Sequence, residues 1–140
     1  MAISSLKEVE FGEELPAFEP DTTLKTGSAF AALVGWGTGM GGRFASHEDA
    51  RKEGLPAAMI PGVLSQGYVV AMIHRWAPAA ELKAIDTVFR APVIADEKHT
   101  ITGVVTDIDE DQGLVELDLT VANEKGETRV FGTATIQLPN

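Results

Sequence analysis

The most constraining feature of this chain is one long apolar segment that lies between two prolines. Residues Val63–Trp76 carry apolar side chains on nearly every helical face, and only Ser65 and Gln66 are polar near its start. A helix that is apolar on all faces is buried on all sides. The length of the segment, with Pro61 before it and Pro78 after it, favours a helix over a strand. The sequence therefore predicts one buried central helix that the rest of the chain must cover.

The chain after residue 80 predicts antiparallel strands. Alternating apolar and polar residues mark four of them, at about Leu82–Phe89, Thr100–Ile108, Leu114–Val121 and Thr128–Leu138. Such alternation is typical of strands with one buried face and one wet face. Gly113 and Gly126 lie in the expected hairpin turns. We expect an α+β fold in which a curved antiparallel sheet wraps its own central helix, with residues 1–140 forming a single domain.

The first 60 residues predict short elements separated by glycines and prolines. We expect an extended lead-in, with a possible strand around Thr22–Thr26. Ser28 is positioned to cap a short helix over Ala29–Gly35, and Ser46 to cap another over His47–Glu53. Residues 35 to 42 contain five glycines and exclude regular helix or strand.

Composition excludes several classes of function. The net charge of −10, from 11 basic and 21 acidic residues, argues against a nucleic-acid binder and against docking on anionic membranes. The absence of cysteine excludes disulfides and thiolate nucleophiles, and three scattered histidines give little support for a metal site. No apolar stretch is long enough to span a membrane, and Met1–Glu10 is too charged for a signal peptide. We expect a soluble, cytoplasmic protein without metal or cofactor.

Four short motifs follow one another in a specific order and spacing. They are Ala50-Arg51-Lys52-Glu53-Gly54-Leu55, Pro61-Gly62, Phe89-Arg90-Ala91-Pro92-Val93 and Asn123-Glu124-Lys125-Gly126. In this order the chain resembles the MaoC-like, or (R)-specific enoyl-CoA hydratase, branch of the hot-dog fold, over essentially its whole length. The resemblance implies a single MaoC-like hot-dog domain.

The resemblance also implies a chemistry, from which this chain departs. Hydratases of that family add water to a trans-2-enoyl thioester through an Asp and a His, which act as general base and acid. A backbone N–H at the start of the central helix holds the thioester oxygen, and Gly62 keeps that position. The ungapped match places Phe44 where the family has its His and Gly39 where it has its Asp. Neither residue can transfer a proton.

Two nearby residues are candidate replacements. His47 and Asp49 form a His-x-Asp triplet three residues after the expected place, so a shifted loop would let them act as the catalytic pair. Alternatively, they form the first turn of a capped, solvated helix, where acidic side chains suit the helix dipole.

The resemblance and the polar residues near the loop indicate a substrate-binding set. It comprises Gly62, Arg43, Met59, Ile60, Gln66 and Trp36. A surface role for Arg43 and a packing role for Trp36 remain alternatives. Gln66 and Ser65 either bond within the fold or point into an acyl pocket. Of the other histidines, we expect His74 to cap the central helix and His99 to be solvated.

Three functions fit the sequence, and whether the chain is itself a hydro-lyase stays open among them. The first is the small, catalytically degenerate subunit of a heteromeric enoyl-CoA hydratase. The second is a self-sufficient homodimeric acyl-CoA hydratase, dehydratase or thioesterase that uses replacement residues. The third is a non-catalytic protein that binds a hydrophobic ligand. The expected ligand is an acyl-CoA or acyl-carrier thioester. The expected assembly is a homodimer or a heteromer with a catalytic MaoC-like subunit.

Overall fold

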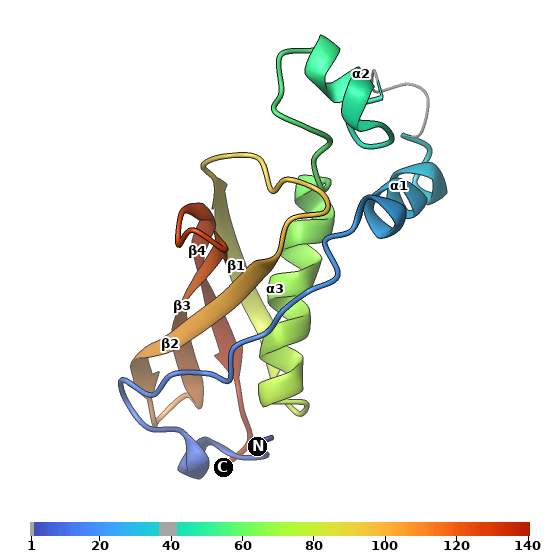
Figure 1. Ribbon diagram of the computed structural model, residues 1–140. Helices are drawn as coiled ribbons and strands as arrows, with labels where there is room; N and C mark the ends of the chain where they lie inside the picture. The colour runs from blue at the N-terminus through green and yellow to red at the C-terminus, as the bar shows by residue number, and fades with distance from the viewer. Residues whose placement is uncertain (1, 37–41) are drawn as a thin grey trace.

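A computed structural model describes residues 2–36 and 42–140 of the chain. A short 3-10 helix, Leu6–Glu8, precedes the helices α1 (Leu24–Leu33), α2 (His47–Lys52) and α3 (Gly62–Trp76). Four strands follow, β1 (Glu81–Phe89), β2 (His99–Asp109), β3 (Leu114–Asn123) and β4 (Thr128–Gln137). Figure 1 shows α3 lying along one face of the sheet, with α1 and α2 beyond its N-terminal end. The predicted central helix, the four strands and the α+β class are confirmed.

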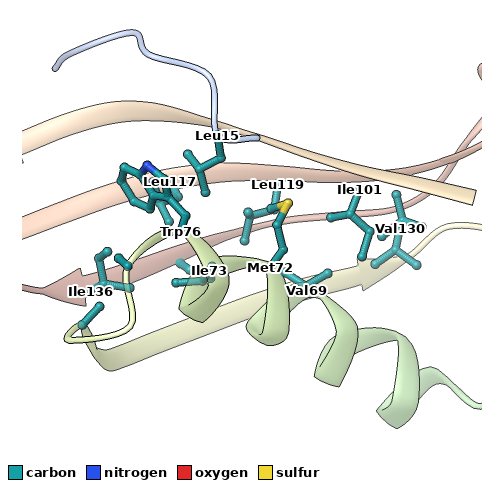
Figure 2. Packing of buried hydrophobic residues seen from close by; sticks show 14 of the residues in the cluster. Leu15, Val69, Met72, Ile73, Trp76, Ile101, Leu117, Leu119, Val130 and Ile136 are labelled. Atoms are coloured by element: carbon teal, nitrogen blue, oxygen red, sulfur yellow. The ribbon is translucent and has the colours of Figure 1, made fainter. Parts of the chain in front are cut away.

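The core lies between α3 and the sheet. Val69, Met72, Ile73 and Trp76 project from α3 toward the strands and are at most 3% exposed (Figure 2). They meet equally buried side chains from β2, β3 and β4, namely Ile101, Leu117, Leu119, Val130 and Ile136. Burying one such side chain fully stabilises the fold by about 1.5–3 kcal/mol. This face of α3 therefore anchors the helix and fixes where its N-terminal end lies.

The two edges of the sheet differ. The strand order is β1-β4-β3-β2, and all pairs are antiparallel. The lead-in covers the outer edge of β2, where Leu15 N–H donates to Gly103 and Phe18 N–H donates to Ile101. In the part of the chain that the structure describes, no strand pairs with the outer edge of β1. An uncovered edge of this kind is a surface for pairing with another chain.

The connection from β1 to β2 brings distant motifs together. Because these strands lie at opposite edges, residues 90–98 must cross the molecule at the N-terminal end of α3. The crossing segment is fixed there by a hydrogen bond of 2.8 Å from Ile60 N–H to the carbonyl of Val93 and by a bridge between Met59 and Ile94. Figure 1 shows this yellow-orange loop passing near the start of α3.

The first helix begins earlier than the sequence predicts. The expected strand at Thr22–Thr26 and the expected Ser28 cap are wrong, because Thr23 caps α1 and its side chain accepts from Thr26 N–H. The Asp21 carboxylate also accepts hydrogen bonds from the hydroxyls of Thr23 and Thr26, which fixes the first turn. The second cap is confirmed, since the Ser46 hydroxyl accepts from Asp49 N–H at the start of α2.

His99 was expected to be solvated, and this is wrong. It opens β2 with 1% of its surface exposed, and its Nδ1 donates to the carbonyl of Glu97 at 2.9 Å. The charged residues before it indicated a wet turn, but the strand begins at His99 and points its ring inward. His74 is near the end of α3 as expected, although its Nε2 donates to the Ala80 carbonyl beyond the helix. Among the described residues, no helix is long and apolar enough to cross a membrane.

Candidate ligand site at the start of α3

A cavity of about 230 Å³ lies at the N-terminal end of α3. Its lining combines the helix start with the crossing segment after β1, and consists of Met59, Ile60, Gly62, Ser65, Phe89, Arg90, Ala91, Pro92 and Val93. Two motifs that carry the family resemblance, 61–62 and 89–93, thus meet at one place. Of the predicted substrate-binding residues, the structure brings Gly62, Met59 and Ile60 together here.

Gly62 presents a backbone donor at this cavity. It is the first residue of α3, so its N–H precedes the intrahelical hydrogen-bond pattern. Its N-cap, Pro61, gives no side-chain cap, and no described residue accepts a hydrogen bond from Gly62 N–H. The helix dipole places partial positive charge at this end. The arrangement favours an oxygen acceptor that carries or develops negative charge.

A side chain at position 62 would crowd the Phe89 ring, which forms part of the cavity wall. A Cβ added there would lie 3.2 Å from Cε1 and 3.3 Å from Cζ of Phe89. Phe89 is the last residue of β1 and is 52% exposed. Glycine at 62 therefore lets the aromatic ring approach the helix start closely.

The two polar residues of the helix start have different surroundings. Gln66 does not line the cavity, because its side-chain amide donates to the Thr87 hydroxyl at 2.9 Å and joins α3 to β1. Ser65 does line the cavity and is 3% exposed. Its buried hydroxyl has no hydrogen-bond partner in the part of the chain that the structure describes. Gln66 thus bonds within the fold, whereas the hydroxyl of the cavity-lining Ser65 stays unpaired.

His47 and Asp49 are two residues apart, and no hydrogen bond or ion pair joins their side chains among the described residues. His47 Nδ1 accepts a 3.1 Å hydrogen bond from Ala58 N–H, so in the neutral ring Nε2 carries the proton and donates it to Asp96 at 2.7 Å. Asp49 is half exposed and lies near Lys52 in the next turn of α2. Neither residue lines the cavity at Gly62. Their proposed role as a replacement pair stays a prediction.

The position expected for the family histidine lies in a packed region. Phe44 is 8% exposed, and its ring centroid lies 6.1 Å from that of Trp36. Gly39, at the position expected for the aspartate, falls outside the described residues. The Arg43 guanidinium forms an ion pair with Glu53 at 3.1 Å. Arg43 and Trp36 are both absent from the lining of the cavity.

Two features of this region were missed from the sequence. Asp96 is the partner of His47, but 49 residues separate them, and Asp96 sits in a charged turn with no signal of its own. Phe89 to Val93 were recognised as a family motif but were not included in the binding set. A signal for them did exist, because a connection between two edge strands must cross the end of the central helix.

Comparison with known proteins identifies the fold. No protein-family model and no curated protein sequence matches the chain. Solved structures do. An (R)-hydratase from A. caviae involved in PHA biosynthesis superposes with a TM-score of 0.84 at 18% identity, covering 95% of this chain and 99% of that one. The ChsH1-ChsH2 complex from Mycobacterium tuberculosis gives 0.80 at 19% identity, covering 92% and 98%.

A third structure extends the comparison. A MaoC-like dehydratase from Rhodospirillum rubrum gives a TM-score of 0.78 at 12% identity, covering 97% of both chains. The chain therefore has the hot-dog fold. Within that fold class, the structures it matches include MaoC-like dehydratases and (R)-hydratases. At such low identities the likeness concerns the fold, and the function must be argued from this chain's own residues.

Proposed function

We propose that this protein binds an acyl thioester at the start of α3 and is the small, catalytically degenerate subunit of a heteromeric enoyl-CoA hydratase. The thioester carbonyl oxygen accepts a hydrogen bond from Gly62 N–H. The acyl chain occupies the cavity beside Phe89 and Pro92, and Arg90 lies at the end that the carrier enters. The phosphopantetheine arm of CoA or of a carrier protein is proposed to extend past Arg90.

The cavity at Gly62 is the observation that carries this proposal. A largely apolar pocket with a few convergent polar groups is the usual form of a small-molecule site. Here Gly62, whose N–H has no acceptor among the described residues, lines a pocket whose walls include Met59, Ile60, Phe89 and Val93. This arrangement fits an apolar chain that ends in a carbonyl group. It also explains why a glycine is the first residue of α3.

The loss of catalysis is supported by the surroundings of two residues. Phe44 is buried against Trp36 and has no titratable group. Both ring nitrogens of His47 are occupied by Ala58 N–H and the Asp96 carboxylate, which leaves neither free to activate water in this arrangement. The chain is therefore proposed to shape a site whose proton-transfer groups come from another subunit.

The exposed side chains and the unpaired outer edge of β1 support the proposal of a partner chain. No residue of this strand is fully buried, and Val88 and Phe89 are 48% and 52% exposed at its end. Its outer edge is unpaired among the described residues, whereas the lead-in covers the edge of β2. One structure of this fold is the ChsH1-ChsH2 complex. A second hot-dog chain paired along β1 would cover both the edge and these side chains.

Two measurements on the purified chain test the proposal. Calorimetry with butyryl-CoA, which has no double bond to hydrate, should show binding. Crotonyl-CoA should not be hydrated measurably, because each missing acid or base group typically costs about 10²–10⁴-fold in rate. Hydration by the isolated chain at the rate of an intact hydratase would contradict the degenerate role. Absence of butyryl-CoA binding would contradict the proposal that the chain binds an acyl thioester.

The partner is tested by affinity capture from the native cells followed by reconstitution. The protein recovered with the tagged chain should be a hot-dog protein with an intact Asp and His, and should hydrate enoyl-CoA faster when this chain is added back. A partner that works equally well without it would contradict the subunit role. A self-sufficient enzyme instead requires that the His47→Ala variant lose a hydratase activity that the isolated wild-type chain possesses.

A further inference from the structure

Ser65 is a buried polar residue that the fold itself does not use. Its hydroxyl oxygen is inaccessible to solvent and has no hydrogen-bond partner among the described residues. A buried polar group without a partner destabilises a folded protein, so nearly all such groups are paired. The other polar residue of this helix start, Gln66, is paired with Thr87. Because Ser65 is one of the residues that line the cavity, a ligand bound there can supply the missing partner.

Ser65 follows Gly62 by three residues on α3. Residues three apart lie on one face of a helix, and each Cα–Cβ bond tilts toward the N-terminus of the helix. The side chain of Ser65 therefore leans back over the first turn. Both residues line the same cavity, so a ligand bound there lies beside both of them.

We propose that the Ser65 hydroxyl is a second donor to the acyl carbonyl oxygen, beside the Gly62 N–H. This inference rests on the proposed function and adds a substrate-binding residue to it. A carbonyl oxygen has two lone pairs and accepts two hydrogen bonds. The ligand that this pair selects is an apolar chain bearing a carbonyl at its head. A chain with the same length but no carbonyl would leave both donors unpaired.

The test compares two probes and three variants by calorimetry. The probes are butyryl-CoA and its thioether analogue S-butyl-CoA, which lacks only the carbonyl oxygen. Ser65→Ala should weaken butyryl-CoA binding by about two- to tenfold, the worth of one hydrogen bond. It should leave S-butyl-CoA binding unchanged. Ser65→Thr keeps the hydroxyl and should restore butyryl-CoA binding. Ser28→Ala, whose hydroxyl lies on α1, is the matched control and should bind like the wild type.

Thermal unfolding of the ligand-free variants separates a binding role from a structural one. Because the hydroxyl has no described partner, Ser65→Ala should unfold at a temperature no lower than the wild type. A lower unfolding temperature would mean that the hydroxyl serves the fold, which overturns the inference. Equal butyryl-CoA affinity for Ser65→Ala and wild type, or an equal loss for both probes, would overturn it as well. If the wild type binds neither probe, the proposed function itself fails.

Discussion

The Asp96 carboxylate lies 2.7 Å from Nε2 of His47 and joins two segments that are 49 residues apart in the sequence. Its other oxygen accepts a 2.9 Å hydrogen bond from Leu24 N–H at the start of α1. Asp96 holds this position with φ at 67°, a left-handed conformation that Asp and Asn tolerate better than most residues. One carboxylate thus fastens the first turns of α1 and α2 to the loop before β2.

Replacing His47 should destabilise the fold. His47→Ala removes the acceptor of Ala58 N–H, and Ala58 is 0% exposed in the intact fold. An unsatisfied buried N–H costs about 1–3 kcal/mol. Urea unfolding should therefore show a lower free energy of unfolding for His47→Ala. Glu48→Ala, on the exposed side of the same helix, should change it little. Equal stability of His47→Ala and wild type would show that the ring does not support this loop.

Asp96 should contribute an acid-sensitive part of the stability. The hydrogen bond from Leu24 N–H, and then that from His47, lower the pKa of Asp96 below its ordinary value of 3.8. Because the unfolded chain takes up the proton first, the contribution is present above pH 3.8 and is lost as the pH falls through the folded-state pKa. Asp96→Asn should lose less stability than the wild type between pH 6 and pH 3, measured by urea unfolding. An identical loss in both proteins would exclude this contribution.

His99 should titrate at a lower pH than an ordinary histidine. Burial lowers the pKa of His99 from 6.5, because the charged ring is less well solvated. Folding therefore favours the neutral ring, and its contribution to stability is present above pH 6.5 and is lost as the pH falls through the folded-state pKa. The ring-proton NMR signal of His99, assigned with the variant His99→Gln, should shift at a midpoint below 6.5. A midpoint at or above that value would contradict the burial of this ring.

The main elements of the fold were predictable because each follows from local periodicity. An apolar segment bounded by prolines could only be buried, and the strand at Leu114–Asn123 alternates along its length. The hairpin at Asn123 was also recognisable. The Asn123 side chain closes this turn by accepting hydrogen bonds from the N–H groups of Lys125 and Glu127. The start of α1 was missed because Asp21, Thr23 and Thr26 make a side-chain network that propensity does not encode.

The candidate site was only partly predictable because it is assembled from segments far apart in the chain. The resemblance pointed to Gly62, which is next to Pro61 and opens the helix. It could not show that Gln66 bonds Thr87 while Ser65 stays unpaired, since both are polar residues at the same helix start. Likewise, the His47–Asp96 contact depends on how the crossing segment after β1 folds back. Tertiary contacts of this kind leave no periodic signal.

The free edge of β1 should mediate self-association or pairing with a partner chain. At micromolar concentration, light scattering should give at least a dimer for the purified protein. Val88→Lys places a charge on the exposed end of β1, where Val88 is 48% exposed, and lysine on an edge strand discourages pairing. This variant should shift the protein toward monomer. Phe11→Lys, at a 75% exposed site on the lead-in, is the control and should not. A monomeric wild type would contradict self-association.

The most direct test of the binding proposal removes the backbone donor at position 62 without removing the helix start. Gly62→Pro deletes this N–H, and proline is well tolerated at the first position of a helix. Gly62→Ala is the matched control, because it keeps the N–H and makes the same Cβ approach to Phe89. Calorimetry with butyryl-CoA should show Gly62→Pro binding about two- to tenfold more weakly than Gly62→Ala, the worth of one hydrogen bond. Equal affinities of these two variants would contradict the claim that Gly62 N–H holds the acyl carbonyl oxygen.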